Sequence, residues 1–195
     1  MIAGIILAAG ASSRMGSPKA LLAYRGETFL DRLIRVFSQV CDPVVVVLGY
    51  HADKIRPRVT GRAQFVVNPD PDRGQLSSLQ TALAVISPEV EGFFFNPVDC
   101  PSAEPATLSL LRNAIAHRDP ATLLVIPQFQ GEHGHPVFAA RPLIAEFLAL
   151  PANAQARQVV HAHKSETQYI DVEDPGILAD IDDIEAYRRL ADVAK

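Results

Sequence analysis

The chain begins with MIAGIILAAG (residues 1–10), and this segment is the strongest indicator of its fold class. The apolar run Ile2–Ala8 is shorter than the about 20 apolar residues that a membrane span needs. It has no basic segment in front of it and passes straight into a polar loop, unlike a signal peptide. An unbroken apolar run of this length is typical of a strand that is buried on both faces. We therefore expect Ile2–Ala8 to form a buried first strand.

Short apolar runs alternate with helical patterns along the rest of the chain, which is typical of a mostly parallel sheet covered on both faces. This pattern predicts an α/β fold of three layers, α/β/α and Rossmann-like, in one domain spanning 1–195, because no repeat or linker interrupts it. Two late segments are expected to pair with the sheet edge or to form a small accessory β element. The expected strands are 2–8, 44–48, 64–67, 92–95, 123–126, 136–139 and 168–172. The expected helices are 29–40, 76–86, 106–117, 142–150, 154–163 and 184–193.

Composition narrows the classes of function. A net charge of -4 without blocks of Lys or Arg argues against a nucleic-acid partner, which requires a basic surface. Cys41 and Cys100 lack the spacing of a disulfide framework and are typical of a reducing compartment. We therefore expect a cytoplasmic protein with neither nucleic-acid nor membrane partners.

The loop after the first strand, Gly10–Lys19, is small and polar, so its backbone N–H groups can surround an anion. Arg14 can donate a forked pair of hydrogen bonds to phosphate oxygens, and Lys19 adds a mobile positive charge. The spacing is neither that of a Walker A loop nor that of a dinucleotide-binding glycine motif. The alternative is a flexible loop with solvated Arg and Lys, although ten residues exceed the usual length of such connections.

Carboxylates after the later strands are candidate ligands for Mg²⁺, which binds one or two carboxylates together with substrate phosphates. Asp99 follows the expected strand 92–95 at the carboxyl end of the sheet, where ligands bind in such folds. Its alternative role is to cap a turn between two prolines. The acidic run Asp180–Asp183 precedes the last helix, and Asp182 with Glu185 also fits a capping box.

Two further polar segments are candidate binding elements. Gly74–Leu79 opens a helix with hydroxyl groups that can either contact a nucleotide or cap the helix. Gly131–Val137 is a polar turn that leads into an apolar strand. Two His-x-His pairs, at 133/135 and 161/163, raise a zinc alternative, but neither has a Cys or carboxylate at ligand spacing. Cys100, next to Asp99, is expected to be a small apolar filler.

The motif LAAGxSxRMGxxK (residues 7–19) resembles the first motif of the MobA-like NTP transferase family, and within it the molybdenum cofactor cytidylyltransferases. Further matches follow in order at 47–49, 74–79, 98–101, 134–136 and 180–183. The resemblance implies a nucleotidyltransferase fold, with Arg14, Lys19 and Asp99 as catalytic residues and Mg²⁺ held by Asp99 and Asp182. The run after Asp182 departs from the usual Thr-Pro-Glu-Asp, so Asp180 and Asp183 stay open as alternatives.

The resemblance also implies the substrates. The implied acceptor is molybdopterin, bordered by Gly134, His135 and Pro136, and the Ala-Ala-Gly form of the first motif favours CTP as donor. A molybdoenzyme or its maturation chaperone is the expected recipient of the product. The implied nucleotide-binding residues are Leu7, Ala8, Ala9, Gly10, Ser12, Arg14, Gly16, Lys19, Gly74, Ser77 and Ser78.

The expected reaction is in-line attack of the acceptor phosphate on the α-phosphorus of the nucleotide, with release of pyrophosphate. Loop amides, Lys19, Arg14 and the metal neutralise charge in the transition state. Two alternatives stay open. One is the same chemistry on a sugar, alcohol or polyol phosphate, and the other is a catalytically silent nucleotide-binding regulatory module.

Overall fold

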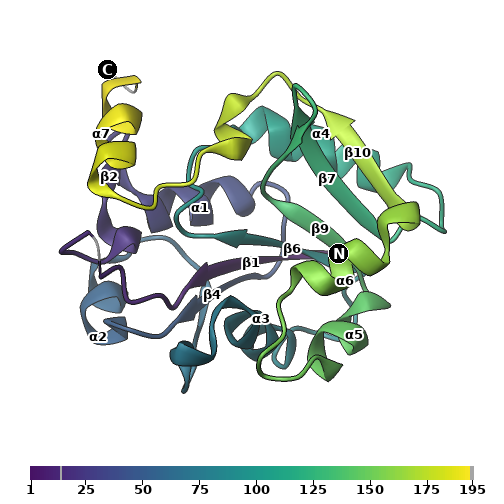
Figure 1. The fold of residues 1–195 in the computed structure, drawn as a ribbon, viewed down its shortest axis with the longest axis horizontal. Coiled ribbons are helices and arrows are strands. Elements are labelled where there is room, and N and C mark those ends of the chain that lie inside the picture. The colour runs from purple at the N-terminus through teal and green to yellow at the C-terminus, as the bar shows by residue number, and fades with distance from the viewer. Residues whose placement is uncertain (14, 194–195) are drawn as a thin grey trace.

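The computed structural model describes residues 1–13 and 15–193, with a mixed eight-stranded sheet between two layers of helices (Figure 1). The strand order is β10-β7-β9-β6-β1-β4-β5, with β8 paired to β7, while β2 and β3 form a separate ribbon. The strands are β1 (Ile2–Ala8), β2 (Ala23–Tyr24), β3 (Glu27–Thr28), β4 (Val44–Leu48), β5 (Gln64–Val67), β6 (Gly92–Pro97), β7 (Leu124–Phe129), β8 (Glu132–His133), β9 (Val137–Ala140) and β10 (Thr167–Asp171). The helices are α1 (Phe29–Phe37), α2 (Ala52–Ile55), α3 (Gln75–Leu83), α4 (Pro105–Ala116), α5 (Leu143–Ala149), α6 (Arg157–Ala162) and α7 (Ile184–Val193). The predicted α/β fold with a mostly parallel sheet is confirmed.

Strand β1 lies inside the sheet and pairs in parallel with β4 on one side and β6 on the other. All seven of its residues are buried, because helices cover both faces of the sheet. From β1 the chain proceeds outward through β4 and β5, and then returns to the opposite side of β1 with β6. The carboxyl ends of β1 and β6 therefore flank a topological switch point, which is where open α/β sheets bind ligands.

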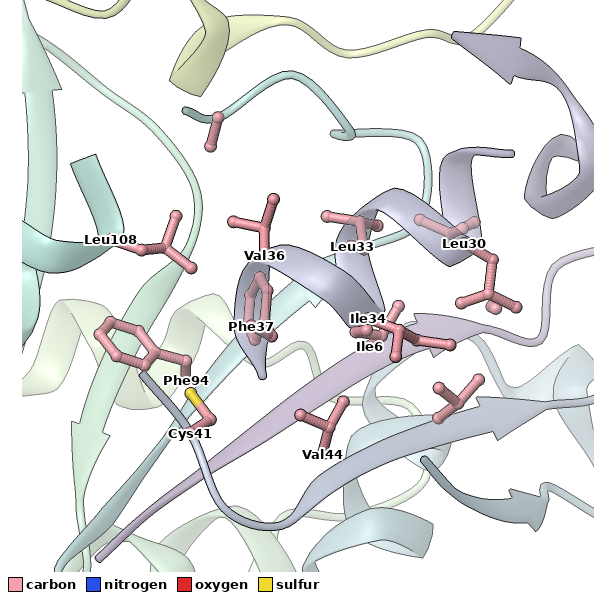
Figure 2. Packing of buried hydrophobic residues seen from close by; sticks show 14 of the residues in the cluster. Ile6, Leu30, Leu33, Ile34, Val36, Phe37, Cys41, Val44, Phe94 and Leu108 are labelled. Atoms are coloured by element: carbon pink, nitrogen blue, oxygen red, sulfur yellow. The ribbon is translucent and has the colours of Figure 1, made fainter. Parts of the chain in front are cut away.

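Helix α1 covers one face of the sheet. Figure 2 shows Ile34 of this helix beside Ile6 of β1, and the ring of Phe37 contacts the ring of Phe94 of β6 edge to face. Thr28 begins the helix as its N-cap, since its hydroxyl accepts a hydrogen bond from the backbone N–H of Asp31. Burying each large apolar side chain of this kind contributes about 1.5–3 kcal/mol. The α1 face therefore fixes the strands whose ends carry the candidate site.

The opposite face of the sheet is covered by α3, α5 and α6, which lie together below the strands in Figure 1. Side chains that alternate with the α1-facing set along β1 and β6 pack here, including Ile5, Phe93 and Phe95. Phe147 of α5 contacts both phenylalanine rings edge to face. Helices α5 and α6, from the later part of the chain, therefore pack on the face of the sheet opposite α1.

The segment predicted at 136–139 is neither an edge strand nor a separate ribbon. β9 lies inside the main sheet and runs antiparallel to both β6 and β7. Its four residues are all buried, so its apolar run has the same appearance as that of a parallel interior strand. The segment at 168–172 does pair at the sheet edge, as β10 beside β7.

The other elements agree with the prediction to within a few residues. α1 and α3 each end three residues before the predicted end, and α6 begins three residues after the predicted start, as is common where helix termini fray. The short ribbon β2–β3 and the helix α2 were not predicted. None of the helices in the described part of the chain has the length and apolarity needed to cross a membrane.

Candidate functional site

The first cavity, of about 310 Å³, opens beyond the carboxyl ends of β1 and β6. The loop after β1 forms one wall, and the turn after β6 forms another. The start of α3 and one residue of the C-terminal acidic run complete it. Its lining includes Leu7, Ala8, Ala9, Gly10, Ser12, Lys19, Gly74, Ser78, Asp99 and Asp182, all of them predicted.

The loop after β1 is closed by its own hydrogen bonds. Ser12 adopts a positive φ of 52°, and its carbonyl oxygen accepts from the N–H of Met15 at 3.0 Å. Its hydroxyl oxygen accepts from the N–H of Lys19, also at 3.0 Å. These bonds hold Lys19 close to the carboxyl end of β1. Gly16 has a φ of 67° and does not line the cavity, and the predicted Arg14 lies outside the described residues.

Lys19 joins two of the predicted carboxylates. Its Nζ lies 2.9 Å from Oδ2 of Asp99 and 3.0 Å from Oδ1 of Asp182. Only 11% of the Lys19 side chain is exposed, against 61% for Asp182. Burial acts to lower the pKa of Lys19, but the ion pairs with both aspartates outweigh it and raise the pKa above its usual value. The lysine is therefore a fixed positive charge within the first cavity.

Asp180 adds a third carboxylate to this region. Ligand atoms of Asp99, Cys100 and Asp180 all lie within 4.8 Å of one another. Burial, together with the negative charges of Asp99 and Asp182, raises the pKa of Asp180. Mutual repulsion of this kind is relieved by a cation, and oxygen ligands suit magnesium and manganese. The donor set therefore fits a divalent metal, with Asp180 as a candidate ligand beside Asp99 and Asp182.

Cys100 is unsuited to nucleophilic or thiolate chemistry. Its side chain is buried, and burial together with the charge of Asp99 raises the pKa of the thiol well above its usual value. Because the thiolate is the reactive form, Cys100 stays inert near neutral pH. This agrees with the prediction that it fills space.

The acidic run is held against the turn after β6 by its backbone. The N–H of Ile181 donates to the carbonyl oxygen of Asp99 at 2.9 Å, so Asp180 and Asp182 flank the residue that is bonded to this turn. The capping role that was the alternative for Asp182 falls to its neighbour. Asp183 instead accepts from the N–H of Ala186 at the start of α7. Asp182 is thereby left to pair with Lys19.

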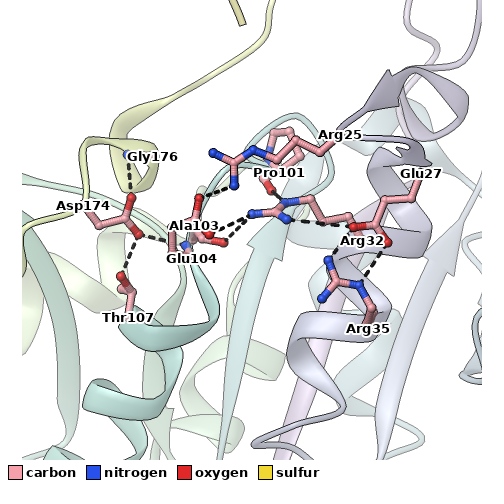
Figure 3. Close-up of polar contacts among 10 residues, drawn as sticks. All are labelled: Arg25, Glu27, Arg32, Arg35, Pro101, Ala103, Glu104, Thr107, Asp174 and Gly176. Carbon is pink, nitrogen blue, oxygen red and sulfur yellow. Dashed lines mark hydrogen bonds and ion pairs between the residues drawn. The ribbon is translucent and has the colours of Figure 1, made fainter. Parts of the chain in front are cut away.

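The turn that carries Asp99 is supported from below by buried polar side chains. Arg32 of α1 is 3% exposed and donates from Nε to the carbonyl oxygen of Pro101 at 2.9 Å. Figure 3 shows that its guanidinium group also reaches Ala103 and lies between Glu27 and Glu104. Because Glu27 lies in the ribbon that follows the first loop, this network ties the segment after Lys19 to the turn after Asp99.

The start of α3 uses its serines partly for structure. Nδ2 of Asn68 donates to Oγ of both Ser77 and Ser78, at 2.8 and 3.0 Å. The Ser77 hydroxyl donates in turn to the carbonyl oxygen of Gly74 and does not line the cavity. Ser78 and Gly74 do line it, and so does Gln75, which was not among the predicted binding residues.

A second cavity, of about 460 Å³, adjoins the first, and Gln75 lines both. Two of the predicted acceptor residues, Gly134 and His135, line it, whereas Pro136 is buried behind them. A Cβ on Gly134 would lie 2.3 Å from the carbonyl oxygen of Ile177, so only glycine fits there. Burial lowers the pKa of His135 despite the charge of Asp99 and a hydrogen bond to the Phe95 backbone.

The histidine pairs do not form a metal cluster in the described part of the chain, where Asp99, Cys100 and Asp180 make the group of ligand type. His133 stacks on Tyr169, with ring centroids 4.2 Å apart and planes inclined by 13°. His163 lies 2.8 Å from a carboxylate oxygen of Glu146. These two histidines therefore have partners other than a metal.

Several lining residues were not among the predicted site residues. Ser13, Pro18, Ala20, Ile55, Pro71, Pro97 and Val98 also line the first cavity. The position of Ser13 and Pro18 inside the anion-binding loop is a signal that could have identified them. Ile55 and Pro71 come from segments whose approach to the loop depends on tertiary packing alone.

Comparisons with known proteins agree with this geometry. Residues 4–167 match the family of the MobA-like NTP transferase domain. The chain is 29% identical over 182 residues to the molybdenum cofactor cytidylyltransferase of Escherichia coli (strain K12), covering 91% of this chain and 89% of that protein. It is 30% identical over 128 residues to a probable molybdenum cofactor guanylyltransferase of Bacillus cereus (strain AH187), covering 64% of this chain and 62% of that protein.

Solved structures give the same result. The crystal structure of Rv0371c from Mycobacterium tuberculosis H37Rv superposes with a TM-score of 0.80 at 29% identity, covering 98% of each chain. A complex of Rv0371c with manganese superposes with a TM-score of 0.76 at 28% identity, again covering 98% of each. The family match extends from within β1 to the first residue of β10, and the chain is a nucleotidyltransferase that belongs to the family of the MobA-like NTP transferase domain.

Proposed function

We propose that the protein transfers a nucleoside monophosphate from CTP to the phosphate of a molybdopterin-type acceptor and releases pyrophosphate. The observation that carries this proposal is the meeting of Lys19, Asp99 and Asp182 in one cavity at the switch point of the sheet. A cation beside two carboxylates, under a loop rich in backbone N–H groups, suits a triphosphate and its metal.

In this proposal, some residues of the first cavity bind the phosphates and others bind the metal. Backbone N–H groups of the loop and the ammonium group of Lys19 hold the phosphate oxygens, and Arg14 is assigned to the same task from its place in the motif. Asp99, with Asp182 and Asp180, would hold a divalent metal, for which we propose Mg²⁺. When bound, such a cation supplies positive charge to the phosphate oxygens.

The attacking group is the acceptor phosphate, which is already anionic at neutral pH, so no general base is required. Its oxygen forms a bond to the α-phosphorus, and the bond from the α-phosphorus to the bridging oxygen of pyrophosphate breaks. The protein contributes by positioning both substrates and by neutralising charge. The inert thiol of Cys100 takes no part.

Two observations support CTP and a molybdopterin-type acceptor. The Escherichia coli cytidylyltransferase matches 91% of the chain, whereas the Bacillus cereus guanylyltransferase matches 64%. Gly134 and His135 line the cavity next to the first one, where an acceptor would lie. We place the reaction in the cytoplasm and propose a molybdoenzyme or its maturation chaperone as recipient of the product.

The test is pyrophosphate release by the purified protein with each of the four nucleoside triphosphates. Each triphosphate is measured with Mg²⁺ or Mn²⁺, and with or without molybdopterin. The expected result is release that requires molybdopterin and metal and is fastest with CTP. Pyrophosphate release with a sugar or polyol phosphate, and none with molybdopterin, would show that the acceptor is not molybdopterin. Nucleotide binding without pyrophosphate release for any acceptor would favour a regulatory module over an enzyme.

A further inference from the structure

The segment between β10 and α7, residues 172–183, carries two of the candidate metal ligands, Asp180 and Asp182. Its one regular element is a short 3₁₀ helix, Pro175–Leu178. Ligands on an irregular segment keep their positions only through contacts with the structure around them. We call residues 172–183 the ligand segment.

The ligand segment lies along the turn after β6, residues 98–104. Near the end of the segment, the N–H of Ile181 donates to the carbonyl oxygen of Asp99 at 2.9 Å. Nearer its start, Gly176 packs so closely that a Cβ there would lie 2.5 Å from the carbonyl oxygen of Ser102. The position of the two aspartates beside Asp99 therefore depends on contact along the whole turn.

Asp174 attaches the start of the ligand segment to the end of this turn. Its Oδ2 accepts from the N–H of Glu104 at 2.8 Å and from the hydroxyl group of Thr107 at 2.6 Å. Its Oδ1 accepts from the N–H of Gly176 at 2.9 Å, and Figure 3 shows these three bonds together. Asp174 is 7% exposed and lies at the start of α4, where the helix dipole favours a negative charge. This buried carboxylate therefore joins the ligand segment to α4.

Glu104 also joins the ligand segment to the part of the chain that follows the first loop. While its N–H donates to Asp174, its carboxylate accepts from Arg25 at 2.6 Å and from Arg32 at 3.4 Å (Figure 3). Arg25 lies between β2 and β3, in the ribbon that comes after Lys19. Segments that carry Lys19, Asp99 and the acidic run are therefore connected through one residue.

Asp174 is not among the described residues that line either the first or the second cavity, so any role in the reaction is indirect. We propose that Asp174 is a positioning residue for the divalent metal, because it holds the ligand segment on the turn after β6 and so sets the separation between Asp99 and the aspartates of that segment. This inference rests on the proposed function, since it takes those aspartates as metal ligands.

The test measures metal binding without turnover. Mn²⁺ is titrated into the protein without nucleotide, and the free metal is measured by electron paramagnetic resonance. In Asp174→Asn the side chain keeps its size, but its amide nitrogen faces a backbone N–H whichever way the amide is turned. The variant is expected to bind Mn²⁺ about tenfold more weakly, as is usual when a contact behind a metal ligand is removed.

The matched control is Asp31→Asn. The Asp31 carboxylate likewise accepts from two backbone N–H groups, those of Thr60 and Gly61, at 2.8 and 2.9 Å, but neither of these residues lines the first or the second cavity. Both variants are expected to lower the melting temperature by a few degrees, because each disturbs a carboxylate that holds a loop. Only Asp174→Asn is expected to weaken Mn²⁺ binding.

In active protein, Asp174→Asn is expected to raise the metal concentration for half-maximal pyrophosphate release about tenfold. The rate at saturating metal should stay within about twofold of the native rate, since no group that contacts the phosphates is removed. Native Mn²⁺ affinity in Asp174→Asn, or equal weakening in Asp31→Asn, would overturn the positioning role.

The proposed function can fail separately. If pyrophosphate is released with molybdopterin but Mn²⁺ affinity is unchanged in Asp174→Asn, the reaction stands and the role of Asp174 is wrong. If Asp174→Asn alone weakens Mn²⁺ binding but no triphosphate yields pyrophosphate, the positioning role stands and the reaction is wrong. Absence of Mn²⁺ binding by the native protein would overturn both the metal ligands and the role of Asp174.

Discussion

The two adjoining cavities are built from different parts of the chain and carry different charges. The first is formed by the loop after β1, the turn after β6 and the acidic run before α7, and in it Lys19 contacts Asp99 and Asp182. The second is formed mainly by α6 and by the segment 133–137, and its described lining has basic and aromatic side chains without carboxylates. The described linings share only Gln75, so we expect substitutions in α6 to alter the second cavity and to leave the chemistry of the first unchanged.

The largest expected effect isolates the first cavity. Asp99→Asn and Lys19→Met should each lower the rate of pyrophosphate release by about 10²–10³-fold, because each removes one electrostatic contact to the phosphates or metal. The affinity for molybdopterin, measured without nucleotide, should stay unchanged in both. The control Lys54→Met removes an exposed lysine that lines neither cavity. A rate within a few-fold of the native rate for either variant would remove that residue from the mechanism.

The next effect tests the support beneath the first cavity. Arg32→Met should lower the free energy of unfolding by about 1–3 kcal/mol, because the carbonyl oxygens of Pro101 and Ala103 lose a buried donor. Urea denaturation measures this change. Arg35→Met is the matched control, since the Arg35 side chain is 48% exposed and its pair with Glu27 should contribute at most about 1 kcal/mol. Equal losses in the two variants would contradict the supporting role of Arg32.

A third variant addresses the second cavity. Gly134→Ala should cost about 1–3 kcal/mol of stability and weaken molybdopterin binding, because its Cβ would force the Ile177 carbonyl away. Gly10→Ala is the control for stability, since its Cβ would meet no heavy atom within 4 Å. Thermal denaturation and molybdopterin titration read out the two effects. Unchanged molybdopterin affinity in Gly134→Ala would show that this turn does not shape the acceptor side.

The smallest expected effect is a pH dependence of stability. Burial lowers the pKa of His135, so the folded state takes up a proton there less readily than the unfolded chain. This contribution is present above the unfolded pKa, near 6.5, and is lost as pH falls through the folded pKa. Between pH 7 and pH 5.5, His135→Gln should therefore lose less stability than the native protein. His117→Gln, which removes an exposed histidine, should lose as much as the native protein.

Two strands that are buried along their whole length were predictable residue by residue. β1 and β4 have the predicted bounds, because a continuous apolar run such as Val44–Leu48 has few other structural solutions. The direction of β9 was not predictable. Its pairing partners lie on β6 and β7, and nothing within Val137–Ala140 encodes which way it runs. The pairing of a strand depends on tertiary contacts, which the local sequence pattern does not specify.

The roles of individual residues could likewise be predicted only in part. Sequence brought Lys19, Asp99 and Asp182 together correctly, since each follows or precedes an element that ends at one edge of the sheet. It could not show that Ser77 turns its hydroxyl back to Gly74, or that Asp183 caps α7. Both depend on side-chain direction. The contribution of Gln75 was missed because a single glutamine at a helix start has no distinctive pattern.

Gln75 lies where the two cavities adjoin and lines both of them. Because Gln75 lines both cavities, we expect the binding of the donor and the binding of the acceptor to be coupled. Reciprocity then requires that the nucleotide alter acceptor affinity by the same factor as the acceptor alters nucleotide affinity. In Gln75→Ala, both changes in affinity should become smaller by the same amount. The size of this decrease would measure how much Gln75 contributes to the coupling between donor and acceptor.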